Sequence, residues 1–183
     1  SDGTTFYYEG SKGQERIVRK KDANGTTFYY EDPKGQERLV RAELVSGEKQ
    51  YFEGPKGQSR IVRKEKANGT TFYYDGPKEQ ERIVRQELSD GTTFYYEGSK
   101  GQERIVWREL PDGSVVFFEG IKGQERAVRE FRTINASQRA LLKEWRTVLL
   151  EQPTVWEFVG WIGEYGARFR HITDIHVEIR NVG

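Results

Sequence analysis

One motif of 22 residues occurs six times in succession, and this period constrains the fold more than any other feature. A glycine marks the same place in every copy, at Gly3, Gly25, Gly47, Gly69, Gly91 and Gly113. A second glycine recurs at Gly13, Gly35, Gly57, Gly101 and Gly123, and Glu79 replaces it in the fourth copy. A repeat of this regularity predicts an array in which each unit packs mainly against its neighbours.

Each unit reads as a β-hairpin. Residues 4–9 are rich in Thr and aromatic side chains, residues 15–20 contain Ile17 and Val18, and glycines bound both runs. Hydrophobic residues make up 34% of the chain and charged residues 32%, which is too few apolar groups for a thick core. The sequence therefore predicts a mainly β fold: a single-layer antiparallel meander of six hairpins within residues 1–134, with about twelve strands.

Both loops of the unit contain turn-forming residues. The first loop reads Leu110-Pro111-Asp112-Gly113, and the second reads Gly54-Pro55-Lys56-Gly57. Pro in the second place favours a type I turn, and Gly in the fourth favours a left-handed bulge residue, so we expect three-residue loops. The alternative is a two-residue primed turn at Asn24-Gly25, but Pro111 fits the bulged turn better.

Three-residue loops would set the pairing of every strand. Phe6 would then lie opposite Val18, Tyr7 opposite Ile17, and Tyr8 opposite Arg16. In the same turn assignment Glu79 would occupy a position that needs positive φ, so we expect backbone strain or a remodelled loop there.

The remaining residues, 135–183, depart from the repeat and predict a helical cap. An apolar stripe at helical spacing predicts a helix over residues 137–152: Leu141, Leu142, Trp145, Val148 and Leu149. Residues 155–165 read as a second helix, and residues 175–179 alternate like a short closing strand. The final repeats become more apolar at five odd-numbered positions, which predicts a docking face for the first helix: Trp107, Val115, Phe117, Ala127 and Phe131. In the expected register, Trp107, Phe117 and Ala127 would lie directly opposite one another on three adjacent strands.

The motif Tyr8-Glu9-Gly10, repeated with one hairpin per unit, resembles MORN repeats. That resemblance covers residues 1–134 and implies an elongated single-layer sheet that acts as a scaffold, with lipid-headgroup contacts in some members. The Gly-x-Gly end of a MORN unit is replaced here by Arg16-Ile17-Val18-Arg19. The Asp/Asn-Gly-x-x-x-Tyr-Tyr core is also similar, more weakly, to YD repeats and to cell-wall-binding repeats.

Two rows of recurring side chains are candidates for ligand contact. The first is Arg16, Arg38, Arg60, Arg82 and Arg104, and the second is Tyr8, Tyr30, Tyr74 and Tyr96. Stacked arginines and aromatics could bind anionic headgroups or glycans. The structural alternative is favoured: Arg over a cross-strand ring stabilises the sheet itself, and neighbouring glutamates cancel its charge.

The sequence offers little material for catalysis. It has no Cys and two His, so we expect no metal site and no cofactor. Glu9 and Glu15 recur as an exposed pair, which is typical of a solvated face more than of an acid–base site. We therefore expect a non-enzymatic scaffold with an extended protein-interaction surface. The alternative is a module that binds glycans or anionic lipid headgroups through the Tyr and Arg rows.

Charge and hydropathy bear on the partners. A net charge of +1 indicates no nucleic-acid partner, and no apolar run is long enough for a membrane span. The expected partners are therefore other proteins or further repeats of the same chain. The open strand edge at the first repeat predicts edge-to-edge self-association, or further hairpins before residue 1. Asn24, Asn68 and Asn135 match the N-glycan acceptor pattern, although Asn-Gly is also good turn chemistry.

Overall fold

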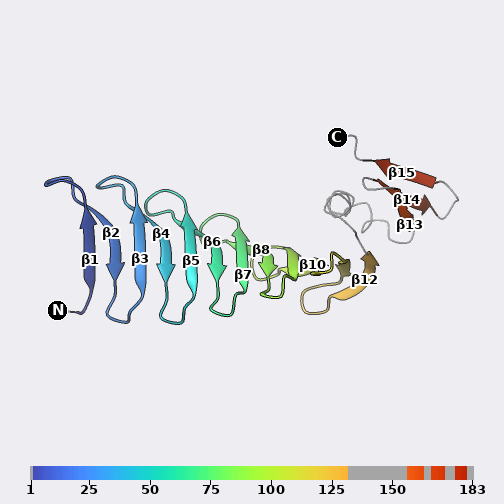
Figure 1. The fold of residues 1–183 in the computed structure, drawn as a ribbon, viewed down its shortest axis with the longest axis horizontal. Coiled ribbons are helices and arrows are strands. Elements are labelled where there is room, and N and C mark those ends of the chain that lie inside the picture. Colours follow the sequence, from blue (N-terminus) through green and yellow to red (C-terminus); the bar gives the residue numbers. More distant parts are fainter. Residues whose placement is uncertain (1, 132–155, 163–165, 172–175, 181–183) are drawn as a thin grey trace.

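The structure, a computed structural model, describes residues 2–131, 156–162, 166–171 and 176–180. Twelve strands in sequence order form one open antiparallel sheet (Figure 1). They are β1 (Thr5–Glu9), β2 (Arg16–Lys21), β3 (Thr27–Glu31), β4 (Arg38–Glu43), β5 (Lys49–Glu53), β6 (Arg60–Glu65), β7 (Thr71–Asp75), β8 (Arg82–Glu87), β9 (Thr93–Glu97), β10 (Arg104–Glu109), β11 (Val115–Glu119) and β12 (Arg126–Phe131). The predicted single-layer meander of six hairpins is confirmed.

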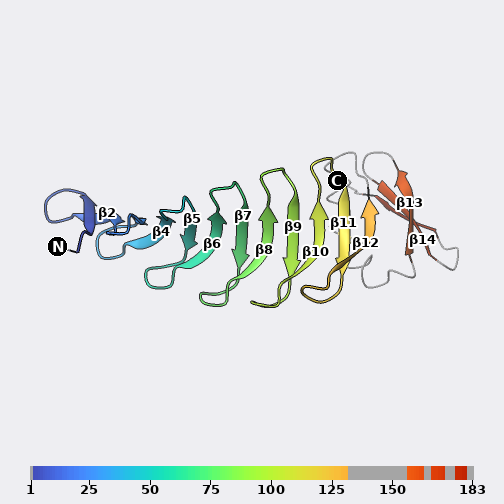
Figure 2. The ribbon, with the colours of Figure 1, turned by 90° about the horizontal axis from the view of Figure 1, so that it is seen from below.

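The sheet twists continuously along its length. Figure 1 shows the strands of the first repeats broadside and β10 almost edge-on, whereas Figure 2, after a quarter turn, shows β7 to β11 broadside. Such a twist is the ordinary consequence of right-handed strand twist accumulating across neighbouring strands. Each unit therefore presents its side chains in a slightly different direction from the last.

The first loop of the unit forms the bulged turn that the sequence predicts. Gly25 N donates to Asp22 O over 2.9 Å, and Asp22 N donates to Thr26 O over 2.9 Å. Gly25 has a φ of 89°, the left-handed conformation expected for the bulge residue. Asn24 Oδ1 also accepts a hydrogen bond from Thr26 N, which holds the turn closed.

The second loop is longer than predicted. Gln36 N donates to Pro33 O, so Pro33 is the first residue of the hydrogen-bonded turn, not the second. Gly35, the third residue, has a φ of 82°, which is the type II pattern. The loop therefore starts earlier and ends later than a three-residue turn. Glu79 occupies the same third position with a φ of 68°, so its predicted positive φ is confirmed.

This longer loop changes the pairing within each hairpin. Glu9 pairs with Arg16 and Tyr8 with Ile17, but Tyr7 pairs with Arg19. Val18 is the extra residue of a β-bulge between them, which resets the register by one residue. The predicted pairs Phe6–Val18, Tyr7–Ile17 and Tyr8–Arg16 are therefore wrong, because the loop and the bulge together displace the partner strand.

The best-buried part of the described sheet lies on β10 and β11. The side chains there with the least exposure are Val106, Trp107, Val115, Val116 and Phe117. Trp107 pairs with Phe117, as expected, and their ring centroids are 5.8 Å apart. Three of the five predicted docking residues, Trp107, Val115 and Phe117, are thus buried.

The other two predicted docking residues, Ala127 and Phe131, lie on β12. Ala127 pairs with Phe118, not Phe117, and is exposed, because the β-bulge recurs in this hairpin. The backbone of Phe131 pairs with Val115. The helix expected over residues 137–152 lies outside the described residues, so its docking stays a prediction.

A second sheet contains β13 (Trp156–Ile162), β14 (Gly166–His171) and β15 (His176–Arg180), in that order. The helix predicted over residues 155–165 is wrong, because β13 occupies most of that range. Its aromatic and branched residues favour an extended strand, and Gly160 disfavours a helix. The closing strand predicted near residues 175–179 is confirmed as β15, but it pairs with β14. Among the described residues, no helix is long and apolar enough to cross a membrane.

Candidate interaction surface

One row of side chains crosses the sheet at the level of Tyr7 and alternates between aromatic rings and guanidinium groups. Strand pairing places its members next to one another in the order Tyr7, Arg19, Tyr29, Arg41, Tyr51, Arg63, Tyr73, Arg85, Tyr95, Trp107 and Phe117. We call this row the Tyr–Arg ladder. The first strand of each hairpin supplies a ring, and the second supplies an arginine except on β10, which supplies Trp107.

The arginines of the ladder lie over the rings of their own hairpins. Four guanidinium carbons lie close to ring centroids: Arg19 at 3.7 Å from Tyr7, Arg41 at 4.0 Å from Tyr29, Arg63 at 3.9 Å from Tyr51, and Arg85 at 4.7 Å from Tyr73. Each is a cation–π contact, worth about 0.5–1 kcal/mol at an exposed site and more when it is desolvated. Pairing with the next hairpin places a second tyrosine on the other side of each arginine.

In the middle of the array, a glutamate binds each stacked Tyr–Arg pair; we call each such pair, or its equivalent, a rung of the ladder. The Tyr51 hydroxyl donates to Glu65 Oε2 over 3.1 Å, and Arg63 Nη2 lies 3.1 Å from Glu65 Oε1. The same arrangement joins Tyr29 and Arg41 to Glu43, and Tyr73 and Arg85 to Glu87. Each carboxylate therefore binds one hydroxyl and one guanidinium, which neutralises the arginine locally.

The last rungs replace charge with apolar contact. Trp107 stands where the other units have arginine, and its ring lies 4.9 Å from Tyr95 and 5.8 Å from Phe117. Tyr95 is partly buried, and this burial raises the pKa of its phenol. The ladder thus becomes a row of aromatic contacts at β9 to β11, where Trp107 and Phe117 are buried.

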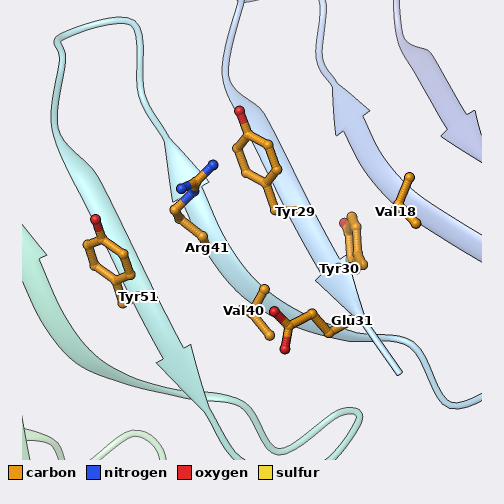
Figure 3. Close-up of a pocket in the computed structure, with 7 residues that line it drawn as sticks. All are labelled: Val18, Tyr29, Tyr30, Glu31, Val40, Arg41 and Tyr51. Atoms are coloured by element: carbon orange, nitrogen blue, oxygen red, sulfur yellow. The ribbon is translucent and has the colours of Figure 1, made fainter. Parts of the chain in front are cut away.

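A shallow hollow that includes ladder residues occurs in each of the first two units. In the second unit it has a volume of about 390 Å³ and is lined by Val18, Tyr29, Tyr30, Glu31, Val40, Arg41 and Tyr51. Figure 3 shows Arg41 between the rings of Tyr29 and Tyr51, with Val40 and Glu31 toward the other end of the strands. In the first unit the equivalent hollow, of about 440 Å³, is lined by Tyr7, Tyr8, Glu9, Val18, Arg19 and Tyr29.

The arginine row proposed from the sequence performs a different task. Arg60 Nη1 donates to Gly76 O in the next unit over 2.9 Å, and Arg16, Arg82 and Arg104 donate to the equivalent carbonyl of the unit that follows them. Arg38 departs from this pattern, because its Nε binds the Asp32 carboxylate at 2.7 Å. Among the described residues, the cation–π contacts involve other cations, so the expected stacking of Arg16 on Tyr8 is wrong. The shifted register is the cause.

The tyrosine row proposed from the sequence does not meet that arginine row either. Tyr8, Tyr30, Tyr74 and Tyr96 pair with Ile17, Leu39, Ile83 and Ile105. Burial raises the pKa of Tyr30, Tyr74 and Tyr96. Tyr96 also donates to Gln86 Oε1 over 2.6 Å. These side chains therefore contribute to packing between strands, while Tyr8 itself is 61% exposed.

The ladder could not be predicted from the sequence alone, because it depends on the register in which the strands pair. Arg19 and Tyr7 recur at the same period as the chosen rows, so the repeat itself held the signal. Only the pairing of Tyr7 with Arg19 distinguishes a stacked row from two unrelated ones. No protein-family model matches the chain, and no curated protein matches it significantly. The described residues contain no group of His, Cys, Asp or Glu arranged to hold a metal ion.

Proposed function

We propose that this chain is a non-catalytic scaffold module that presents the ladder side of its sheet to protein partners. The observation that carries the proposal is the occurrence of the same shallow hollow in both of the first two units. An enzyme concentrates its reactive groups in one site, whereas a surface that repeats unit by unit suits a partner contacted at several points. This architecture also agrees with the scaffold role that the resemblance to MORN repeats implies.

The spacing of the hollows favours an extended polypeptide. Equivalent positions in neighbouring units are two strands apart, about 9.6 Å. A polyproline II segment has three residues per turn and rises about 9.3 Å per turn, so every third side chain of such a partner would meet a hollow. Val18 and Val40 would contact apolar side chains, and Glu31, whose carboxylate is largely exposed, would hydrogen-bond backbone amides at the rim.

The alternative, a module for glycans or anionic headgroups, has less support from the geometry. A glycan stacks on open ring faces, but guanidinium groups cover the rings of Tyr29 and Tyr51. Anionic headgroups need unpaired cations, but the ladder arginine Arg63 is paired with Glu65. Both features favour a protein partner over these two ligand classes.

Parallel binding screens test the proposal. The chain is applied to a peptide array, a glycan array and vesicles containing phosphatidylserine. We expect saturable binding to peptides, weakened at least tenfold in the double variant Val18→Glu, Val40→Glu and in the rim variant Glu31→Lys. The control is Ile121→Glu, at an exposed loop position outside the hollows, which should bind like wild type.

Circular dichroism checks that each variant keeps its sheet, and Glu31→Lys serves if the valine variant unfolds. Saturable binding to glycans or vesicles alone would support the alternative and reject the proposal. Peptide binding that both hollow variants retain would reject the hollows as the contact surface.

A further inference from the structure

The first rung of the ladder, Tyr7 with Arg19, differs from the next three rungs at one position. Lys21 stands where the next four units have a glutamate: Glu43, Glu65, Glu87 and Glu109. In the second, third and fourth rungs that glutamate binds both the arginine and the tyrosine hydroxyl. The first rung therefore has a cation at the place where its neighbours have their carboxylate.

Both cations of the first rung lack a carboxylate partner. Among the described residues, neither Arg19 nor Lys21 forms an ion pair, and no group accepts a hydrogen bond from the Tyr7 hydroxyl. Arg19 is half-buried and Lys21 is exposed, and residues two apart on a strand lie on the same face. The first rung thus gathers two positive charges and one hydroxyl donor on one face of the sheet.

A hollow of about 660 Å³ adjoins this rung on the side of the first loop. Its lining includes Tyr7, Lys21 and Asp22. The Asp22 carboxylate would repel an anion, but it lies 2.7 Å from Lys20 Nζ, which compensates its charge. The hollow therefore gives an external group access to Lys21 and to the Tyr7 hydroxyl.

The second rung shows how a carboxylate fits such a pair. The Tyr29 hydroxyl donates to Glu43 Oε2 over 2.9 Å, and Arg41 Nη2 lies 3.5 Å from Glu43 Oε1. The two oxygens of one carboxylate thus bind the hydroxyl and the guanidinium separately. Tyr7 and Arg19 pair and stack as Tyr29 and Arg41 do, so they present the same two donors.

We propose that the first rung binds the carboxylate of an Asp or Glu side chain from a protein partner. The Tyr7 hydroxyl donates to one oxygen and Arg19 to the other, as in the second rung. Lys21 adds a third donor and a second positive charge, and hydrogen bonds between ionised groups are the strong ones. This inference deepens the proposed function and rests on it for the partner being a protein.

The site lies within the sheet and is independent of what lies beside β1. Arg19 is placed between Tyr7 and Tyr29, and Lys21 between Thr5 and Thr27. All three groups of the site come from β1 and β2, which pair directly with each other.

A carboxylate contact at this rung also gives the hollows a register. Equivalent hollows let a repetitive partner bind in more than one position along the array. Arg41, Arg63 and Arg85 already bind glutamates of their own units. An acidic residue of the partner therefore selects the first rung over the next three and fixes one position.

A small probe tests the site without the hollows. The probe is N-acetyl-Gly-Glu-Gly-amide, whose glutamate carboxylate is its one charge and which has no apolar side chain. It is titrated into the full chain at low ionic strength, where surface charges are screened least. We expect saturable shifts of the Arg19 Nε–H and Tyr7 ring signals in nuclear magnetic resonance spectra. The matched peptide with glutamine in place of glutamate should cause none.

Two variants of Lys21 separate its charge from its place in the rung. Lys21→Glu supplies the internal carboxylate of the neighbouring rungs and should weaken binding of the probe by about tenfold or more. Lys21→Met removes the charge but keeps an unbranched side chain, and should also weaken binding. The matched control is Lys49→Met, at an exposed lysine of the third unit whose backbone pairs with Glu43 and Glu65, and it should bind like wild type.

The reverse substitution should create a second site. Glu43→Lys removes the internal carboxylate of the second rung, so the probe should then also shift the Arg41 Nε–H signal. Circular dichroism checks that each variant keeps its sheet. Lys21→Glu follows the pattern of the next four units, so it serves if another variant unfolds.

Four results would overturn the inference. They are equal shifts with the glutamine peptide, undiminished binding in Lys21→Glu, tighter binding of inorganic phosphate than of the probe, and vesicle binding through phosphatidylserine that Lys21→Glu abolishes. The valine variants of the hollows judge the proposed function separately, because this probe has no side chain to place in a hollow.

Discussion

The guanidinium carbon of Arg63 lies 3.9 Å from the ring centroid of Tyr51 on the neighbouring strand, and both side chains bind the Glu65 carboxylate. The three side chains thus share one cation–π contact, one ion pair and one hydrogen bond on a sheet that has little apolar core. Because equivalent contacts recur along the array, they stabilise a single-layer sheet, which lacks the apolar interior of a β-sandwich.

The ladder arginines should stabilise the array more than exposed arginines do. Arg63→Ala removes a stacked cation and leaves Glu65 with one partner fewer, so we expect the free energy of unfolding to fall by about 1–2 kcal/mol. The control is Arg126→Ala, whose side chain is 79% exposed, and which should change it by less than about 0.5 kcal/mol. Urea titrations followed by circular dichroism measure both. Equal effects of the two changes would contradict a structural role for the ladder.

Trp107 replaces a ladder arginine at the best-buried rung. Restoring the repeat pattern with Trp107→Arg places a charge where the native side chain is 1% exposed, between Tyr95 and Phe117. We expect a loss of several kcal/mol, because burial disfavours a charge without full compensation. Thermal melts followed by near-ultraviolet circular dichroism report the change. A variant that melts like wild type would show that this rung tolerates the consensus arginine.

Glu79 has a left-handed backbone at a position where five other units have glycine. Glu79→Gly should stabilise the chain by about 1 kcal/mol, because glycine adopts positive φ without a Cβ penalty. The bond from Lys100 Nζ to Glu79 O uses the backbone, so the substitution keeps it. The reverse change, Gly57→Ala, should destabilise the chain by a similar amount. Gly57 has positive φ, and no atom lies within 4 Å of the added Cβ, so the backbone cost acts without a steric clash. Urea midpoints that move in the same direction for both would contradict the turn assignment.

The two glycines of the second loop should differ in their tolerance of a side chain. A Cβ at Gly98 would clash with the Gln102 carbonyl oxygen, whereas a Cβ at Gly101 would meet no atom within 4 Å. Both have positive φ, so both alanine variants carry the backbone cost of about 1 kcal/mol. Gly98→Ala adds a steric clash and should destabilise by about 2–4 kcal/mol. Comparable thermal shifts for the two variants would argue against the close approach.

Loop carboxylates should make stability depend on acid pH. The pKa of Glu37 is held below its usual value by its own backbone N–H and then by those of Gly35 and Ile17, against an opposing effect of burial. Because the folded pKa lies below the unfolded one, about 4.3, its stabilisation is present above that pH and is lost as pH falls through the folded value. Glu37→Gln should therefore flatten the decline in urea midpoint between about pH 5 and pH 3. An unchanged decline would contradict this role for Glu37.

The repeat alone predicted most of the architecture. The period of 22 residues, the strand-forming runs and the paired glycines indicated six hairpins in one meander, and the first loop was predicted down to its bulge glycine, Gly25. These features are local: a turn type depends on a few neighbouring residues, and strand propensity depends on composition within a short run. Within the repeat array, sequence therefore determined which segments are strands and that Glu79 would have positive φ.

Tertiary structure decided the pairing across each hairpin. The bulge at Val18 depends on how two strands settle against each other and against the next unit, and no short run of sequence indicates it. The longer loop places Glu9, not Tyr8, opposite Arg16, and the bulge then places Arg19 opposite Tyr7, so that Arg19 and not Arg16 lies on a tyrosine ring. The helix predicted over residues 155–165 failed for a related reason. Short apolar runs fit either period, and the pairing of β13 with β14 decided between them.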